Sequence, residues 1–238
     1  VRNLLAVDFD TGKRLWDVPV DDHLEAQLDA SANDWMSQQS VQLPVGLAQR
    51  IWDDAAYGRL SSDGQRVFSV EDLGVAAGMY LGRTVFIRGR RLRDPGEPKP
   101  FNRLAAHDIR TGKLQWHLGG PSDQFGLRLP ETFFLGPPLP LAGRLYVLSE
   151  SKEEIRLHAL QAETGDSLWS QQLAVVEQPI QRDVVRRLAG ASPSYADGIL
   201  VCPTSAGAVV AVELATRSLL WGYRYAREAD PNGQFRDP

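Results

Sequence analysis

An 11-residue pattern occurs four times along this 238-residue chain and constrains its fold more than any other feature. The copies run from Ala6 to Trp16, Ala106 to Trp116, Ala159 to Trp169 and Ala211 to Trp221. The two complete copies read Ala-x-Asp-x-x-Thr-Gly-x-x-x-Trp. Each copy predicts a strand, a two-residue Thr-Gly turn and a second strand that ends on tryptophan, because glycine adopts the positive φ of a tight turn.

The other two copies are degenerate, and they depart from the pattern at the aspartate and glycine positions. The third has Gln161 in place of aspartate, and the fourth has Glu213 in place of aspartate and Arg217 in place of glycine. The tryptophan spacing remains regular: 53 residues separate Trp116 from Trp169, and 52 separate Trp169 from Trp221. Internal repeats of this size predict a repeat architecture.

Around each copy the chain predicts a unit of four antiparallel strands in a meander. A strand, an Asp-Gly-type turn, a second strand and a loop precede the repeated hairpin, and apolar residues alternate at a strand's period of two. Four-stranded units of about 40–50 residues are typical of β-propellers. We therefore predict an all-β fold, a partial β-propeller that forms an open arc of about three and a half blades.

The predicted domain is a partial propeller over residues 1–225, followed by a linker over 226–238 that leads into further sequence. Its parts are a half blade at 1–20, a blade at 52–120 that carries an insertion at 72–101, a blade at 131–173 and a blade at 190–225. We expect Thr132 to Leu141 to be one strand and a helical turn to follow Pro179. Because the chain begins inside a strand pattern, we expect it to be a piece of a longer protein.

Composition excludes several classes of function. Hydrophobic residues make up 43% of the chain and charged residues 24%, which are ordinary values for a globular protein. The net charge of -4 gives no support to nucleic-acid binding. The one cysteine, Cys202, excludes an internal disulfide, and we expect it to be a small buried hydrophobe. No stretch reaches the roughly 18 apolar residues that a membrane span requires.

The order of strands predicts one plain face and one decorated face. Loops after the first and third strand of each unit are short, whereas long segments fall in the other loops. These long segments are 17–50, 72–101, 117–131 and 170–190. Since function concentrates in long loops on a rigid scaffold, we expect a protein partner on the decorated face.

The insertion at 72–101 carries a cluster of positive charge within this acidic chain. Its candidate interaction residues are Arg88, Arg90, Arg91 and Arg93. The cluster either binds an anionic partner, such as an acidic protein or a polysaccharide, or is an ordinary solvated loop.

The repeated pattern resembles the tryptophan-docking repeat of the propellers similar to pyrroloquinoline quinone (PQQ) enzymes. The resemblance implies that each indole docks between adjacent blades, and it therefore assigns structural roles to one set of residues. These are Trp16, Trp116, Trp169, Trp221, Gly12, Gly112 and Gly165. From their place in the hairpins, Asp8 and Asp108 are interpreted as acceptors for backbone N–H groups in the turns.

Two branches share this repeat, namely quinoprotein dehydrogenases and non-catalytic scaffolds such as the outer-membrane assembly lipoprotein of Gram-negative bacteria. The dehydrogenases resemble one another in a vicinal cysteine pair and a bound calcium, and a chain with one cysteine has no such pair. The resemblance therefore favours a scaffold or protein-interaction module in the periplasm or cell envelope, with no cofactor. The alternatives are a fragment of a PQQ- and calcium-dependent dehydrogenase, or a carbohydrate-binding propeller that uses exposed aromatics such as Trp35 and Tyr80.

The sequence contains no further pattern that predicts catalysis or metal binding. His23, His107, His117 and His158 share no ligand spacing, and we interpret them as structural or exposed residues. No nucleophile elbow, glycine-rich phosphate loop or His-Glu-x-x-His motif occurs. We therefore expect no catalytic, cofactor-binding or metal-binding residue in this chain.

Overall fold

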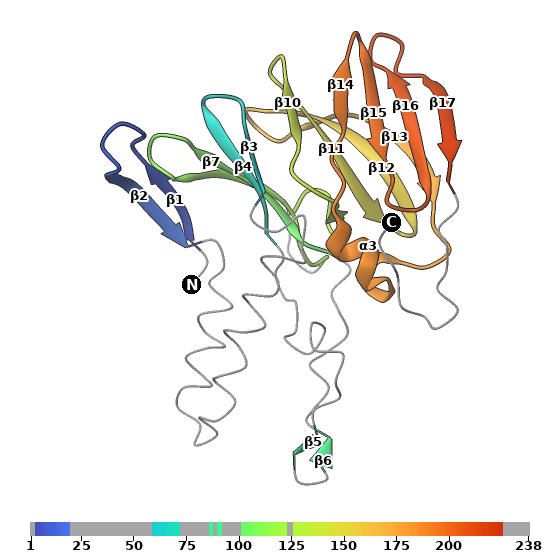
Figure 1. Ribbon diagram of the computed structural model, residues 1–238, viewed down its shortest axis with the longest axis horizontal. Helices are drawn as coiled ribbons and strands as arrows, with labels where there is room; N and C mark the ends of the chain where they lie inside the picture. Colours follow the sequence, from blue (N-terminus) through green and yellow to red (C-terminus); the bar gives the residue numbers. More distant parts are fainter. Residues whose placement is uncertain are drawn as a thin grey trace.

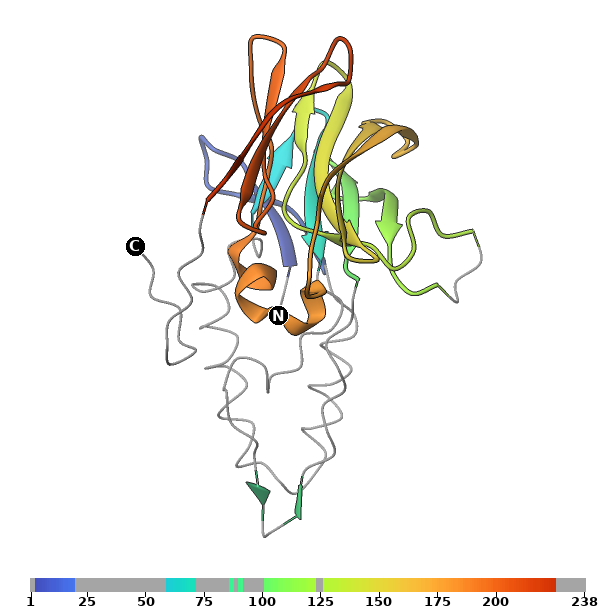
Figure 2. The ribbon, with the colours of Figure 1, turned by 90° about the vertical axis from the view of Figure 1, so that its right-hand side faces the viewer.

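The computed structural model describes residues 3–19, 59–71, 86–87, 90–91, 101–122 and 126–225, the two short pairs by their backbone alone. These residues form antiparallel sheets that fan out side by side in chain order (Figure 1). The predicted all-β fold, a partial β-propeller, is confirmed. Seen from the side, the sheets of blades 3 and 4 stand above the short helix α3 (Figure 2).

The first two sheets contain the two complete copies of the repeat. Hairpin 1 consists of β1 (Asn3–Val7) and β2 (Arg14–Pro19). Blade 2 consists of β3 (Leu60–Ser62), β4 (Arg66–Glu71), β7 (Arg103–Asp108) and β8 (Leu114–Gly119). A separate two-stranded ribbon pairs β5 (Phe86–Ile87) with β6 (Arg90–Arg91).

The other two sheets contain the degenerate copies. Blade 3 consists of β9 (Phe133–Phe134), β10 (Leu139–Leu141), β11 (Arg144–Ser151), β12 (Glu154–Gln161) and β13 (Ser167–Val175). Blade 4 consists of β14 (Ser194–Ala196), β15 (Ile199–Pro203), β16 (Ala208–Glu213) and β17 (Leu219–Arg224). The 3-10 helix η2 (Ile180–Arg182) and α3 (Val184–Ala189) join these blades, so the predicted helical turn after Pro179 is confirmed.

The core lies between consecutive sheets, because alternate residues of a strand point to opposite faces. On β11, Leu145 and Val147 join a cluster with Phe68 and Leu104 of blade 2. The intervening residues of β11 face the other way and join a cluster with blade 4. Blade 3 is therefore buried on both faces, which holds the sheets in a fan.

Two local predictions are wrong in their details. The second strands do not end on tryptophan, since β8 continues to Gly119 and β13 to Val175. The Thr-Gly turn is also longer than two residues, because the N–H of Asp108 bonds to the carbonyl of Lys113 and closes a loop between them. The aspartate side chain supplies acceptors inside this loop, and a longer connection is stable for that reason.

The strand predicted from Thr132 to Leu141 is interrupted. Phe133–Phe134 and Leu139–Leu141 both pair with β11, whereas residues 135–138 belong to no strand, although the N–H of Leu135 donates to the carbonyl of Leu148 at 2.9 Å. Pro137 and Pro138 lie in this gap and have no N–H to donate to a ladder. The carbonyl of Pro137 instead accepts a bond from Ser192 Oγ, 3.0 Å away.

A β-bulge occurs at the same place in all four copies of the repeat. The register shifts after Ala6, Ala106, Ala159 and Ala211, each of which pairs with the tryptophan of its copy. One extra residue therefore precedes every tryptophan on its strand. A bulge increases the local twist and re-aims the neighbouring side chain, so this shared irregularity gives each indole the same orientation relative to its sheet.

Candidate functional site

The short turns and the long connectors lie at opposite ends of the blades (Figure 1). Hairpin turns such as Asp63-Gly64, Ala142-Gly143 and Asp197-Gly198 form the plain face. The connector between β8 and β9 and the segment that contains η2 and α3 form the opposite face, here called the connector face. The larger part of 17–50 and 72–101 lies outside the described residues. That a partner binds the decorated face therefore stays a prediction.

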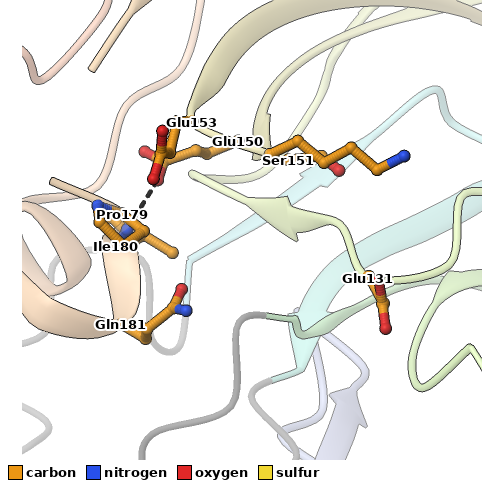
Figure 3. A pocket seen from close by; sticks show the side chains of 8 residues that line it. Glu131, Glu150, Ser151, Glu153, Pro179, Ile180 and Gln181 are labelled. Atoms are coloured by element: carbon orange, nitrogen blue, oxygen red, sulfur yellow. Dashed lines mark hydrogen bonds between the residues drawn. The ribbon is translucent and has the colours of Figure 1, made fainter. Parts of the chain in front are cut away.

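A pocket of about 410 Å³ opens on the connector face (Figure 3). It is lined by the tight turn between β11 and β12, by Glu131 from the connector that precedes β9, and by η2 with its preceding proline. Its lining residues are Glu131, Glu150, Ser151, Lys152, Glu153, Pro179, Ile180 and Gln181. Three segments distant in sequence thus meet at one site, which no local pattern indicated.

Glu150 fixes the wall of this pocket from within. Its side chain is buried, and one carboxylate oxygen accepts the backbone N–H of Ile180 at 2.6 Å. The other oxygen forms an ion pair with Arg186, which is also buried and donates to the carbonyl of Gln178 at 2.7 Å. Because Glu150 lies next to the end of β11 in blade 3 and Arg186 lies on α3, this pair attaches the connector to the blade.

The same connector is held by two further contacts. Asp183 caps α3 by accepting the backbone N–H of Arg186 at 3.0 Å. The guanidinium of Arg187 lies 4.7 Å from the ring centroid of Phe133, a cation–π distance. The pocket mouth carries the exposed carboxylates of Glu131 and Glu153 beside Lys152, so its open side has a negative excess suited to a basic group.

The tryptophans of the first two copies contact the next unit along the chain. Trp16 Nε1 donates to the carbonyl of Ile109 at 2.9 Å, and Trp116 Nε1 donates to the carbonyl of Ala162 at 3.1 Å. Both carbonyls occupy the same repeat position, three residues after the alanine. The indoles also contact turn glycines closely: a Cβ on Gly112 would approach Trp16 to 2.6 Å, and one on Gly165 would approach Trp116 to 2.8 Å.

The last two copies depart from this arrangement. Trp169 faces Arg217, whose guanidinium lies 5.9 Å from the indole centroid. Arg217 has φ of 59°, close to the 72° of Gly165, so the backbone conformation is retained where the glycine is lost. Trp221 is 48% exposed. At the other end of the arc, a Cβ on Gly12 would meet no described atom within 4 Å.

Residues 2–235 match the protein family described as outer membrane protein assembly factor BamB. The chain belongs to this family. The predicted resemblance to the PQQ-like repeat propellers is thereby confirmed.

Several solved structures are similar to this chain. BamB from Moraxella catarrhalis is 14% identical with a TM-score of 0.52, and the match covers 93% of this chain and 46% of that one. A europium-containing methanol dehydrogenase (13% identity, TM-score 0.48, covering 93% of this chain and 38% of that one) also matches. So does the quinohemoprotein alcohol dehydrogenase of Comamonas testosteroni, at 14% identity and a TM-score of 0.47, with 93% and 32% covered. This chain thus spans about half the length of the BamB structure, and no curated protein matches it.

The repeat aspartates of this BamB-family chain act as turn acceptors, as predicted. Asp8 Oδ1 accepts the N–H of Thr11 at 2.8 Å, and Asp108 Oδ1 accepts the N–H of Thr111 at 2.9 Å. The threonine hydroxyls donate to the same oxygens. These hydroxyl and N–H bonds lower the pKa of both aspartates below the ordinary value.

Two of the histidines predicted to be structural or exposed are buried between sheets. His158 Nε2 lies 2.8 Å from Ser149 Oγ, and burial followed by the charge of Arg156 lowers its pKa to about 4. His107 Nδ1 lies 3.0 Å from the carbonyl of Gly112, so it orders its own turn. Both are structural, as predicted.

A polar network surrounds His107 within blade 2. The buried carboxylate of Glu71 lies 3.4 Å from His107 Nε2 and accepts from Arg103 Nε at 2.5 Å. Ser69 Oγ donates to the same carboxylate at 3.1 Å. Every named member belongs to β4 or β7, so the network ties two neighbouring strands together.

Cys202 is fully buried, as predicted, and burial raises the pKa of its thiol to about 12. Within the described residues, no group of three or more His, Cys, Asp or Glu side chains is arranged to hold a metal ion. The same residues include no helix long and apolar enough to cross a membrane. Arg88, Arg93, Trp35 and Tyr80 lie outside the described residues, as do the side chains of Arg90 and Arg91.

Proposed function

We propose that this BamB-family chain is a non-catalytic scaffold of the cell envelope that binds partner proteins through its connector face. The observation that carries the proposal is the pocket beside η2. Its wall is anchored by the buried Glu150–Arg186 pair, while its rim carries exposed carboxylates. A rigid wall with a charged, accessible rim suits recognition of a polypeptide that carries a basic side chain.

The location in the periplasm or envelope is part of the same proposal and follows from the family description, outer membrane protein assembly factor. We also propose that residues 1–225 form one propeller module, with the part-blades at 1–20, 52–120, 131–173 and 190–225, and that 226–238 is a linker. The basic insertion at Arg88 to Arg93 is proposed as a second contact, for an anionic partner.

The experiment places a photo-crosslinking amino acid at one of two positions, in the helix η2 beside the pocket or in an exposed hairpin turn. One derivative carries it at Gln181 on the connector face, and the matched control carries it at Asp197 on the plain face. Both are produced in a Gram-negative envelope and irradiated. We expect discrete protein adducts from position 181 and none from 197. Equal adduct patterns, or adducts only from 197, would contradict the proposal.

The proposal includes no cofactor, and the dehydrogenase alternative is tested separately. The described residues do not form a set of carboxylates for calcium, and the one cysteine is buried without a vicinal partner. The chain is incubated with PQQ and calcium, and quinone absorbance and dye reduction are followed. We expect no saturable signal. A saturable signal with dye reduction would establish the enzymatic alternative.

A further inference from the structure

The turn between β11 and β12 has two charged side chains in a backbone conformation that favours glycine. Lys152 and Glu153 form the two-residue loop of this hairpin, because Ser151 pairs with Glu154. Their φ values are 51° and 64°. A two-residue loop in which both φ values are positive favours glycine or asparagine, since a Cβ is strained there. Both residues line the pocket on the connector face.

Blades 3 and 4 contain two other hairpins with a loop of this type, and both loops end on glycine. Ala142-Gly143 joins β10 to β11, with φ of 49° and 75°. Asp197-Gly198 joins β14 to β15, with φ of 48° and 83°. These two loops lie on the plain face. The loop at the pocket therefore has a glutamate at the position where both loops of the plain face have the unstrained residue.

Contacts within the described part of the chain do not account for Glu153. Its side chain is exposed, and whereas the neighbouring Glu154 pairs with Arg156 at 2.6 Å, the Glu153 carboxylate has no such partner among the described residues. Its backbone carbonyl accepts the N–H of Val176 at 2.9 Å, a bond that glycine would also form. Residues held in unfavourable backbone conformations cluster at binding sites, where the strain serves function.

The other two carboxylates of the pocket are already engaged. Glu150 is buried and bonded to the connector that contains η2 and α3. Glu131 accepts from Ser122 Oγ at 2.8 Å. Figure 3 shows Glu131 and Glu153 on different sides of the pocket. Glu153 is thus the pocket carboxylate that can accept a hydrogen bond from a partner without releasing an internal donor.

We propose, resting on the function proposed above, that Glu153 is the residue that determines which partners the pocket accepts. Its carboxylate binds a lysine or arginine side chain of the partner polypeptide through a charge-assisted hydrogen bond. The strained turn fixes the carboxylate at the rim, and the buried Glu150–Arg186 pair fixes the wall behind it. The chain retains a less stable turn in exchange for this contact.

The experiment measures the binding of fluorescein-labelled oligolysine to the full 238-residue chain by fluorescence anisotropy, with acetylated oligolysine as the uncharged probe. We expect the unaltered chain to bind oligolysine and not the acetylated form. Glu153→Gly should weaken this binding by about fivefold, the upper range for an exposed ion pair. It should also raise the urea midpoint, because the strain of a Cβ is removed. Glu153→Gln should weaken binding equally without this gain.

The matched control is Asp197→Gly, which also removes one exposed carboxylate and one side chain at positive φ, but from the plain face. The control should bind oligolysine as the unaltered chain does. Equal weakening in the control and in Glu153→Gly would assign the binding to net charge and overturn the proposal. Equal binding of both probes by the unaltered chain, or a lower urea midpoint in Glu153→Gly, would also overturn it.

Photo-crosslinking from Gln181 separates this proposal from the one on which it rests. Adducts that form from position 181 in a chain whose oligolysine binding does not change in Glu153→Gly would overturn the role of Glu153 alone. Absence of adducts from position 181 would contradict the connector face as the binding surface, and the role of Glu153 with it.

Discussion

The guanidinium of Arg217 lies 5.9 Å from the ring centroid of Trp169, at the repeat position where Gly165 contacts Trp116 directly. The arginine keeps the left-handed backbone of the glycine, with φ of 59°. The fourth turn therefore contacts the preceding tryptophan through a long cationic side chain rather than through bare backbone. One repeat position thus makes two different contacts with an indole.

The first prediction concerns the strain at this arginine. Arg217→Gly and Arg217→Ala both remove the guanidinium, but only alanine retains a Cβ at positive φ. A residue with a Cβ in this region is less stable by about 1–2 kcal/mol, partly offset by the greater freedom of glycine in the unfolded chain. We expect the glycine variant to be more stable than the alanine variant by about 1 kcal/mol in urea unfolding. Equal midpoints would show that the turn relaxes to accommodate a Cβ.

The second prediction concerns the close contact of Gly165 with Trp116. Gly165→Ala adds a Cβ that would lie 2.8 Å from the indole, at φ of 72°. Backbone strain and overpacking together should lower the free energy of unfolding by about 2–4 kcal/mol.

The matched control for that prediction is Gly143→Ala in the same blade. Gly143 has φ of 75°, and its Cβ would meet no described atom within 4 Å. Only the strain of a Cβ at positive φ remains, so we expect the free energy of unfolding to fall by about 1 kcal/mol. The difference between the two variants measures the contact with the indole, and a difference near zero would be evidence against it.

The third prediction concerns pH. The pKa of His158 in the folded protein is about 4, below the ordinary 6.5, so folding is opposed wherever the unfolded chain binds this proton. Stability from this residue is fully present above pH 6.5 and is lost as the pH falls towards 4, by up to about 3 kcal/mol. Urea unfolding of the protein and of His158→Gln at pH 7, 6 and 5 should show a shallower decline in the variant. Parallel declines would assign the pH dependence to other groups.

The fourth prediction concerns the buried pair on the connector face. Glu150→Ala removes the carboxylate that accepts from Ile180 and Arg186, and leaves the guanidinium buried without it. Breaking a buried pair in this way costs about 3–5 kcal/mol. Thermal unfolding should show a large fall in Tm.

A double replacement separates the charge effect from packing. Glu150→Leu combined with Arg186→Met removes both charges and keeps apolar volume, so we expect a smaller loss than in Glu150→Ala. If the double variant is as unstable as the single one, the pair matters for its shape and hydrogen bonds rather than for its charge.

Much of the local structure could be predicted from the sequence, because short-range patterns encode it. The alternation in each copy predicts strands, and Gly112 and Asp108 predict the turn through its positive φ and its N–H acceptors. The length of that turn and the bulge before each tryptophan were missed. Both features depend on how the two strands of the hairpin pair, and the residue pattern of a single strand does not show this pairing. The extra residue before the tryptophan is common to all four copies, and this shared spacing is the one signal that could have indicated the bulge.

The sequence by itself determined the repeat, its strands and its turns, and through them the family fold. Only the tertiary structure decided which indoles are covered, since Trp116 bonds to a residue 46 positions away and Trp221 is half exposed at the same repeat position. It also decided the pocket, where Glu150 meets Arg186, 36 positions away in sequence. Such contacts depend on how whole sheets pack, and the free energy of that packing is distributed over residues that no short segment contains.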